Sequence, residues 1–267
     1  MLLQKLYHDL IDTLLPRTCI VCGRRLVPME EVCCTACSIN MPLTNYKACK
    51  GNPIERIFWG KIPIVRANAY MHYEPHSQYA QIITRLKYKN NPHIGIYLGR
   101  LIAEDLITTG FFEDIDLMIP LPLAWSRQYS RGYNQCLFIA KGIQQIVPLK
   151  IDTRSIKRSK ANKKQALTHK SLRHNNVKDI FSLAIPCNIN EQTVLTPLET
   201  LNPVKQHPTP STHPLANKHV LLIDDIITTG ATLLSCGKIL STIPGIRISI
   251  LCVGVAGHKR WGVRNPE

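Results

Sequence analysis

A chain of 267 residues with 45% hydrophobic content is long enough for one α/β domain and a small accessory module. Its formal net charge of +15 predicts anionic partners such as phosphates, nucleic acid or an acidic membrane surface. No apolar run reaches the roughly 18–20 residues that span a bilayer, and acidic residues interrupt the leucine-rich N-terminus. We therefore expect a cytoplasmic protein without an export signal or stable membrane insertion.

The first predicted element is an amphipathic helix over residues 1–15, which ends at Pro16. Leucines recur on one face of this helix at the spacing of successive turns. We expect that face to dock on the body of the protein, and a peripheral membrane contact is the alternative.

Five of the ten cysteines follow within residues 19–37. Two C-x₂-C pairs with eleven residues between them are formed by Cys19, Cys22, Cys34 and Cys37. Four thiolates at this spacing are typical of a structural Zn²⁺ site, which has no open position for chemistry. Cys33 is a competing ligand, but only Cys34 has the right spacing to the last cysteine of the set. The sequence predicts zinc in an N-terminal module, residues 1–50, with reduced free thiols as the alternative.

Strand and helix periods alternate through the middle of the chain. We expect a strand or two over 62–73, helices over 76–89 and 94–107, and a buried strand over 115–119. A polar turn with cations comes next, at Arg127, Arg131 and Gly132. A further helix starts at Asn134 and Gln135, with an inward face of Leu137, Phe138, Ile143 and Ile146. Lys87 either faces a phosphate or complements the C-terminal end of its own helix.

A strongly basic stretch over residues 153–178 contains nine cations and no acid. Such a density suits pyrophosphate or a nucleic-acid backbone, and a solvated loop is the alternative. A short strand is expected over 180–185. Residues 186–218 are rich in proline and lack periodicity, so we expect a flexible insertion and assign it no function.

The stretch from His219 to Thr232 has the order buried strand, two acids, small-residue turn, helix. Asp224 and Asp225 are placed to hold sugar hydroxyls, or Mg²⁺ bound to them. Backbone N–H groups at the turn and at the helix N-terminus bind anions, and the threonine hydroxyls add donors. Gly230 permits a positive φ within the turn. The alternative is an ordinary strand-to-helix turn in which an aspartate caps the helix.

This string resembles the ribose-5-phosphate signature of the type I phosphoribosyltransferases. The resemblance implies that Asp224 and Asp225 contact the 2′ and 3′ hydroxyls of phosphoribosyl pyrophosphate (PRPP), together with Mg²⁺. It also implies a 5′-phosphate site in the turn, formed by Thr228, Thr229, Gly230, Ala231 and Thr232. Purine salvage members of that superfamily carry an acid at the position of Thr228, and threonine is a poor general acid or base at neutral pH.

Three further strings, PLPL, RGYNQ and KANKKQALTHKSLRHNNVKDIF, are similar to the ComF family of competence-associated proteins, which includes GntX-like proteins. The similarity covers nearly the whole chain. It implies an α/β fold, with a type I phosphoribosyltransferase-like doubly wound, mainly parallel sheet over residues 51–267. It implies a pyrophosphate loop with Arg127, Arg131 and Gly132. It also implies a mobile basic loop that closes over PRPP, with Lys163, Lys164, Gln165 and Arg173.

The function that this resemblance implies is PRPP binding by a protein of DNA uptake or processing in natural transformation. Its partners would be single-stranded DNA or other competence proteins. Two alternatives stay open: an active phosphoribosyltransferase that displaces pyrophosphate with an unknown acceptor, and a nucleic-acid-binding protein with a vestigial PRPP site.

Overall fold

A computed structural model describes residues 16–47, 49–88, 91–158, 180–184 and 213–257. Three sequence predictions lie outside the described residues. They are the helix over residues 1–15, the basic loop with Lys163, Lys164, Gln165 and Arg173, and most of the insertion 186–218.

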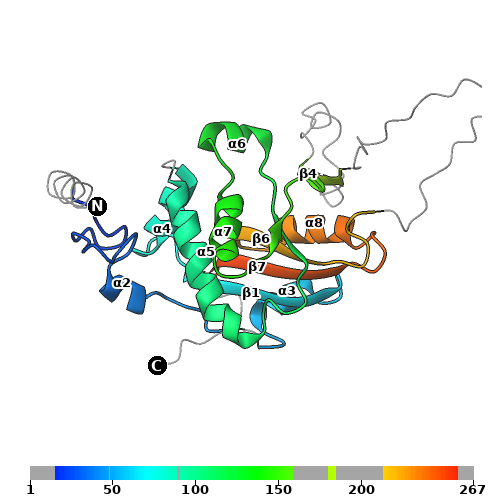
Figure 1. Cartoon of the computed structure of the whole chain (residues 1–267), viewed down its shortest axis with the longest axis horizontal. Coiled ribbons are helices and arrows are strands. Elements are labelled where there is room, and N and C mark those ends of the chain that lie inside the picture. The colour runs from blue at the N-terminus through cyan, green and yellow to red at the C-terminus, as the bar shows by residue number, and fades with distance from the viewer. Residues whose placement is uncertain (1–15, 48, 89–90, 159–179, 185–212, 258–267) are drawn as a thin grey trace, which may run out of the picture.

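A five-stranded sheet forms the centre of the molecule (Figure 1). Its strands, in spatial order, are β1 (Ile64–Tyr73), β7 (Arg247–Ala256), β6 (His219–Ile227), β2 (Leu117–Pro120) and β3 (Lys150–Ile151). Every neighbouring pair is parallel. The central strands β6 and β7 contain apolar runs, residues 220–223 and 250–253, because both faces of a parallel sheet are buried. The expected mainly parallel α/β architecture is confirmed, while the finer phosphoribosyltransferase-like fold stays a prediction.

Helices cover both faces of this sheet. Alternate residues of β6 divide between two apolar clusters, with Leu221 and Ile223 in one and Val220 and Leu222 in the other. The first cluster includes residues of α4 (Ala80–Tyr88), α5 (Pro92–Leu106) and α7 (Gln135–Gln144). The second includes residues of α3 (Pro53–Phe58) and α8 (Ala231–Leu240). The period of two along the strand therefore sets which helix packs on which face.

Helices α5 and α7 approach each other at two glycines. A Cβ at Gly99 would lie 2.1 Å from the carbonyl oxygen of Ile139, and one at Gly142 would lie 2.1 Å from that of Ile96. No side chain fits at either place, so these glycines fix the distance between the two helices.

The predicted inward face of α7 is partly wrong. Ile143 is fully buried, but the other buried apolar positions are Cys136, Ile139 and Ala140, and Leu137 lies at the edge. Phe138 and Ile146 pack against the cluster as partly buried side chains, and the backbone of α7 meets α5 at Gly142.

The predicted polar turn after β2 is also wrong in one respect. Residues Trp125–Arg131 form a short helix, α6, which ends at Gly132 in the left-handed conformation, with φ of 76°. None of the residues of α6 is buried. The helix therefore lacks the apolar periodicity by which sequence analysis recognises helices.

Three short elements complete the described part of the chain. A separate antiparallel hairpin pairs β4 (Ile156–Arg158) with β5 (Phe181–Leu183). A 3₁₀ turn, η1 (Ile107–Thr109), follows α5. Helix α2 (Thr35–Ile39) belongs to the N-terminal four-cysteine module.

Candidate functional site

A cavity of about 320 Å³ opens at the carboxyl ends of β2 and β6. Parallel sheets bind ligands at this edge, where loops and helix N-termini gather. The charged side chains that line it come from four separate elements and are Lys87, Arg127, Arg131, Arg158, Asp224 and Asp225. Cations outnumber carboxylates, so the cavity favours an anionic ligand.

Asp225 is held firmly from two sides. Its side chain is 6% exposed, and its Oδ1 lies 3.1 Å from Nζ of Lys87 in α4. The amide Nε2 of Gln135, at the start of α7, donates to Oδ2 at 2.7 Å. A buried carboxylate needs such partners, because an unpaired charge in this position would be strongly unfavourable.

Asp224 lies in a different environment. Its Oδ1 accepts hydrogen bonds from the backbone N–H of Asp225 at 2.8 Å and from the thiol of Cys136 at 3.7 Å. Burial, followed by the neighbouring charge of Asp225, raises the pKa of Asp224 from 3.8 to about 7. A ligand that brings a cation or hydroxyl donors to this carboxyl would favour its ionised form.

The turn after β6 presents backbone donors to the same cavity. Thr228 and Thr232 line it, and Gly230 between them has a φ of 73°. Helix α8 begins at this turn after Gly230, which has no side chain to cap it, and the N–H of Ala231 donates a long hydrogen bond of 3.4 Å to Oγ1 of Thr229. A Cβ at Gly230 would lie 2.7 Å from Cγ2 of Ile57, which adds a packing reason for glycine here.

Arginines from α6 and β4 contribute to the same cavity. Arg127 and Arg131 line it, as does Arg158, whose guanidinium lies 5.3 Å from the ring centroid of Phe181. Burial, then repulsion by Arg127, lowers the pKa of Arg158. Clustered guanidinium groups of this kind are suited to phosphate oxygens.

The structure brings together most of the residues that the sequence singled out. Asp224, Asp225, Thr228, Thr232, Arg127 and Arg131 line one cavity. Thr229, Gly230 and Ala231 form the turn beside it, and Gly132 closes α6. Two contacts were not predicted from the sequence: Gln135 donates to Asp225, and Lys87, which lines the cavity in the last turn of α4, pairs with the same carboxylate.

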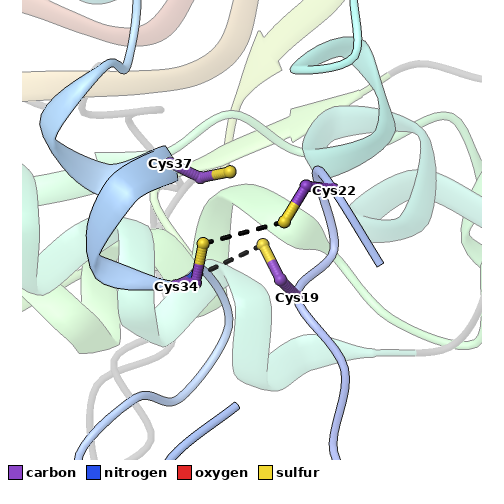
Figure 2. Close-up of side chains that lie close together, drawn as sticks. All are labelled: Cys19, Cys22, Cys34 and Cys37. Atoms are coloured by element: carbon purple, nitrogen blue, oxygen red, sulfur yellow. Dashed lines mark hydrogen bonds between the residues drawn. The ribbon is translucent and has the colours of Figure 1, made fainter. Parts of the chain in front are cut away.

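The four predicted cysteine ligands form a second site in the N-terminal module. The sulfur atoms of Cys19, Cys22, Cys34 and Cys37 all lie within 4.8 Å of one another. Figure 2 shows the four side chains pointing toward a common centre. Four thiolates leave no open coordination position, so they suit a structural metal and are compatible with Zn²⁺. The neighbouring Cys33 points instead into the apolar core, where burial raises its pKa to about 12.

Backbone donors prepare this site for a cation. Burial raises the pKa of Cys19, but hydrogen bonds from backbone N–H groups outweigh it, and the net pKa falls to about 6. Glu30 braces the module by accepting hydrogen bonds from the backbone N–H groups of Val27 and Thr35, which lower the pKa of Glu30 to about 2. The fold of the loop thus favours an ionised thiolate at Cys19, whereas burial and hydrogen bonds with the neighbouring thiols raise the pKa of Cys37.

The module is attached to the helices next to the cavity. The hydroxyl of Tyr79, just before α4, donates to the carbonyl oxygen of Cys37 at 3.1 Å. Ser38 and Tyr97 of α5 share a hydrogen bond of 3.2 Å, and Arg100 pairs with Glu31. Helix α4 therefore contacts the four-cysteine site at one end and carries Lys87 at the other.

Comparison with known proteins gives relatives of low but extended similarity. No known protein-family model matches the chain. The DNA utilization protein YhgH of Escherichia coli (strain K12) is 22% identical over 88% of each chain. Competence protein F of Haemophilus influenzae is 28% identical over 68% of this chain and 66% of its own length. Among the described residues, no helix is both long and apolar enough to cross a membrane.

Proposed function

The relatives support assignment of this chain to the ComF family, and from that premise we propose that it binds PRPP with Mg²⁺ and acts in DNA uptake or processing. The names of the relatives support the second part of this proposal, since they refer to DNA utilization and to competence. The first part depends on the chemistry of the cavity.

One observation carries the PRPP proposal: two carboxylates, two threonines of the turn before α8 and three arginines line one cavity. PRPP has a sugar with free hydroxyls between a phosphate and a pyrophosphate. The carboxylates suit the hydroxyls, the turn suits the 5′-phosphate, and the arginines suit the pyrophosphate. A volume of about 320 Å³ lies within the usual range of small-molecule sites, roughly 300–1,000 Å³.

The donor set also fits Mg²⁺ that arrives with the ligand. Mg²⁺ keeps most of its coordination on water and phosphate oxygens and takes few carboxylates from proteins. Asp224 is the carboxyl with capacity to spare, because Lys87 and Gln135 already hold Asp225. When bound, the ion would neutralise phosphate charge, and the residues of this chain would orient the sugar.

Binding is the part of the chemistry that these residues support best. Transfer to a base acceptor would need a group that handles a proton at the acceptor, and the side chain nearest to that task in the turn is Thr228. A threonine hydroxyl is a weak acid and a weak base at neutral pH. We therefore confine the proposal to ligand binding and treat pyrophosphate release as a separate measurement.

A thermal-shift titration tests the proposal. At PRPP near 100 times its Kd, ligand binding stabilises the fold by about 2.7 kcal/mol, which raises Tm by about 5–10 °C. We expect this shift only with Mg²⁺, and we expect its loss in Asp224→Asn/Asp225→Asn. Glu104→Gln, an exposed acid on α5, is the control and should keep the shift. An equal shift with inorganic pyrophosphate alone, or in the double variant, would contradict the proposal.

A further inference from the structure

An exposed group of aromatic and arginine side chains lies at the mouth of the cavity. Trp125 and Tyr129 of α6 are 70% and 81% exposed, and Tyr88 at the end of α4 is 71% exposed. We call these three residues, with Arg127 and Arg131, the aromatic–arginine patch. Figure 1 shows α6 projecting beyond the sheet and the packed helices. The two arginines also line the cavity, so patch and cavity are continuous.

The rings in this patch are already arranged face to face. Trp125 and Tyr129 are stacked, with centroids 5.7 Å apart and planes inclined by 20°. The guanidinium of Arg131 lies 5.3 Å from the ring centroid of Tyr88. The aromatic pair and the arginine pair of α6 are each spaced four residues apart, which places both members of a pair on the same side of a helix. Residues two apart lie on opposite sides of a helix, so the stacked rings are on one side of α6 and the two arginines, which line the cavity, are on the other.

The fold itself does not explain these side chains. No residue of α6 is buried, so the helix adds nothing to the apolar core. Large aromatic side chains gain free energy when they leave water, and several of them exposed together mark an interaction surface. The sequence of α6, WSRQYSR, has no acid and no aliphatic residue.

Charge and chemistry select the occupant of the patch. A second copy of this chain would bring the same cations against these, which is repulsive. An interfacial helix needs a broad apolar face to bury at the headgroup boundary, and α6 offers two aromatic rings among five polar residues. Unpaired nucleobases of any sequence stack on exposed aromatic rings, and arginines neutralise the phosphates between the bases. These are the features of a single strand rather than a duplex, whose bases are already stacked.

We propose that the aromatic–arginine patch is a stacking platform for single-stranded DNA, with phosphates of the strand held by Arg127 and Arg131 at the mouth of the cavity. The proposal rests on the proposed role in DNA uptake or processing and specifies its surface. It is independent of PRPP binding, because Trp125 and Tyr129 are not among the residues that line the cavity.

Fluorescence anisotropy with two labelled strands of about 12 nucleotides tests the platform. One strand is oligothymidylate, and the other is an abasic strand with the same backbone. Wild type should bind oligothymidylate at least tenfold more tightly than the abasic strand. Trp125→Ala/Tyr129→Ala should lose that preference and bind both strands with the affinity of wild type for the abasic one. Trp125→Phe/Tyr129→Phe keeps flat rings and should restore most of the preference.

The matched control is Trp59→Ala, since Trp59 is 55% exposed but lies after α3, on the other face of the sheet. It should bind like wild type. Arg127→Gln and Arg131→Gln should weaken both strands and reduce the slope of log affinity against log salt by about 0.7 for each phosphate contact removed. The aromatic variants should leave that slope unchanged.

Several results would overturn the platform. They are failure of wild type to bind oligothymidylate, equal binding of the abasic strand, unchanged binding by the double alanine variant, and equal loss in Trp59→Ala. Binding of the patch to anionic vesicles or to a second copy of the chain, abolished by the same alanine variants without effect on DNA, would also overturn it. The thermal shift with PRPP in Trp125→Ala/Tyr129→Ala separates the proposals, because that shift should persist whether or not the platform exists.

Discussion

The four-cysteine module and the cavity each consist of polar side chains that lie close together, but the fold brings these side chains together in different ways. The module takes all of its ligands from one short segment, residues 19–37, and its loops alone set the distance between the sulfur atoms. The cavity takes its charged residues from α4, α6, β4 and β6, which lie far apart in the chain. Spacing along the sequence therefore determines the first site, and packing of the whole domain determines the second.

The largest expected effect comes from the module, because local ligands without a large core depend on metal. Chelation of the ion should lower Tm by more than about 10 °C. Cys34→Ser should abolish the bound metal, measured by elemental analysis of the purified protein. Cys33→Ala, at the neighbouring buried position, should retain one ion per chain. Loss of metal in both variants alike would show that the assignment of Cys34 as a ligand is wrong.

The next effect concerns the link between α4 and β6. Lys87→Met leaves the carboxylate of Asp225 with Gln135 as its remaining side-chain donor, and we expect a loss of about 2–4 kcal/mol in the free energy of unfolding. Urea denaturation measures this loss. Lys87→Met/Asp225→Asn should recover most of it, since the uncompensated charge is gone. If the double variant is as unstable as the single one, the pair does not account for the stability of this contact.

A smaller effect is expected where α7 begins. The side chain of Asn134 accepts from the N–H of Cys136 at 2.9 Å and donates to the carbonyl oxygen of Leu121 at 3.0 Å. Asn134→Ala should cost about 1–2 kcal/mol, while Asn134→Asp keeps the cap and loses only the second bond. Thermal denaturation of the two variants separates these contributions. Equal stability of wild type and the alanine variant would refute the capping role.

The smallest expected effect is a change of Tm with pH, which has opposite signs in the cavity and in the four-cysteine module. The folded pKa of Asp224, about 7, lies above its ordinary value of 3.8, so its stabilising contribution is complete below pH 4 and disappears as pH rises through 7. Without ligand, Asp224→Asn should therefore melt a few degrees above wild type at pH 8 and close to it at pH 4. Equal Tm differences at both values would contradict the raised pKa.

Glu30 should respond in the opposite direction. Its folded pKa of about 2 lies below the ordinary 4.5, so its stabilising contribution is complete above pH 4.5 and is lost as pH falls toward 2. Glu30→Gln should lower Tm at pH 7, and the difference from wild type should narrow between pH 5 and 3. A difference that stays constant with pH would show that the charge of Glu30 does not brace the module.

The sequence predicts a site best where the residues of that site lie in one short stretch of the chain. The cysteine ligands and the order of strand, acids, turn and helix around Asp224 were visible because each lies in one continuous stretch. The strand and helix positions predicted from apolar periodicity agree with the structure to within a few residues at β1, β2 and α5. Apolar periodicity indicates which side of an element is buried, and most of the described helices and strands have a buried side.

What sequence analysis missed depends on contacts between distant segments or on elements without burial. The partner of Lys87 lies in β6, and nothing near Lys87 in the sequence indicates it. Helix α6 has no buried face, so its arginines were assigned to a turn. The inward side of α7 depends on its contact with α5, where Gly99 lies against Gly142, and the sequence of α7 alone does not show that contact.

Calorimetric titration of PRPP and Mg²⁺ into the wild-type protein and into Asp224→Asn/Asp225→Asn tests the central claim most directly. We predict one saturable site in the wild type and at least about a hundredfold loss of affinity in the variant, which corresponds to about 2.7 kcal/mol. Because binding favours the ionised form of Asp224, the wild-type enthalpy near pH 7 should also change with the ionisation enthalpy of the buffer. Wild-type and variant proteins that bind PRPP equally well, or a wild type that does not bind it, would contradict the account.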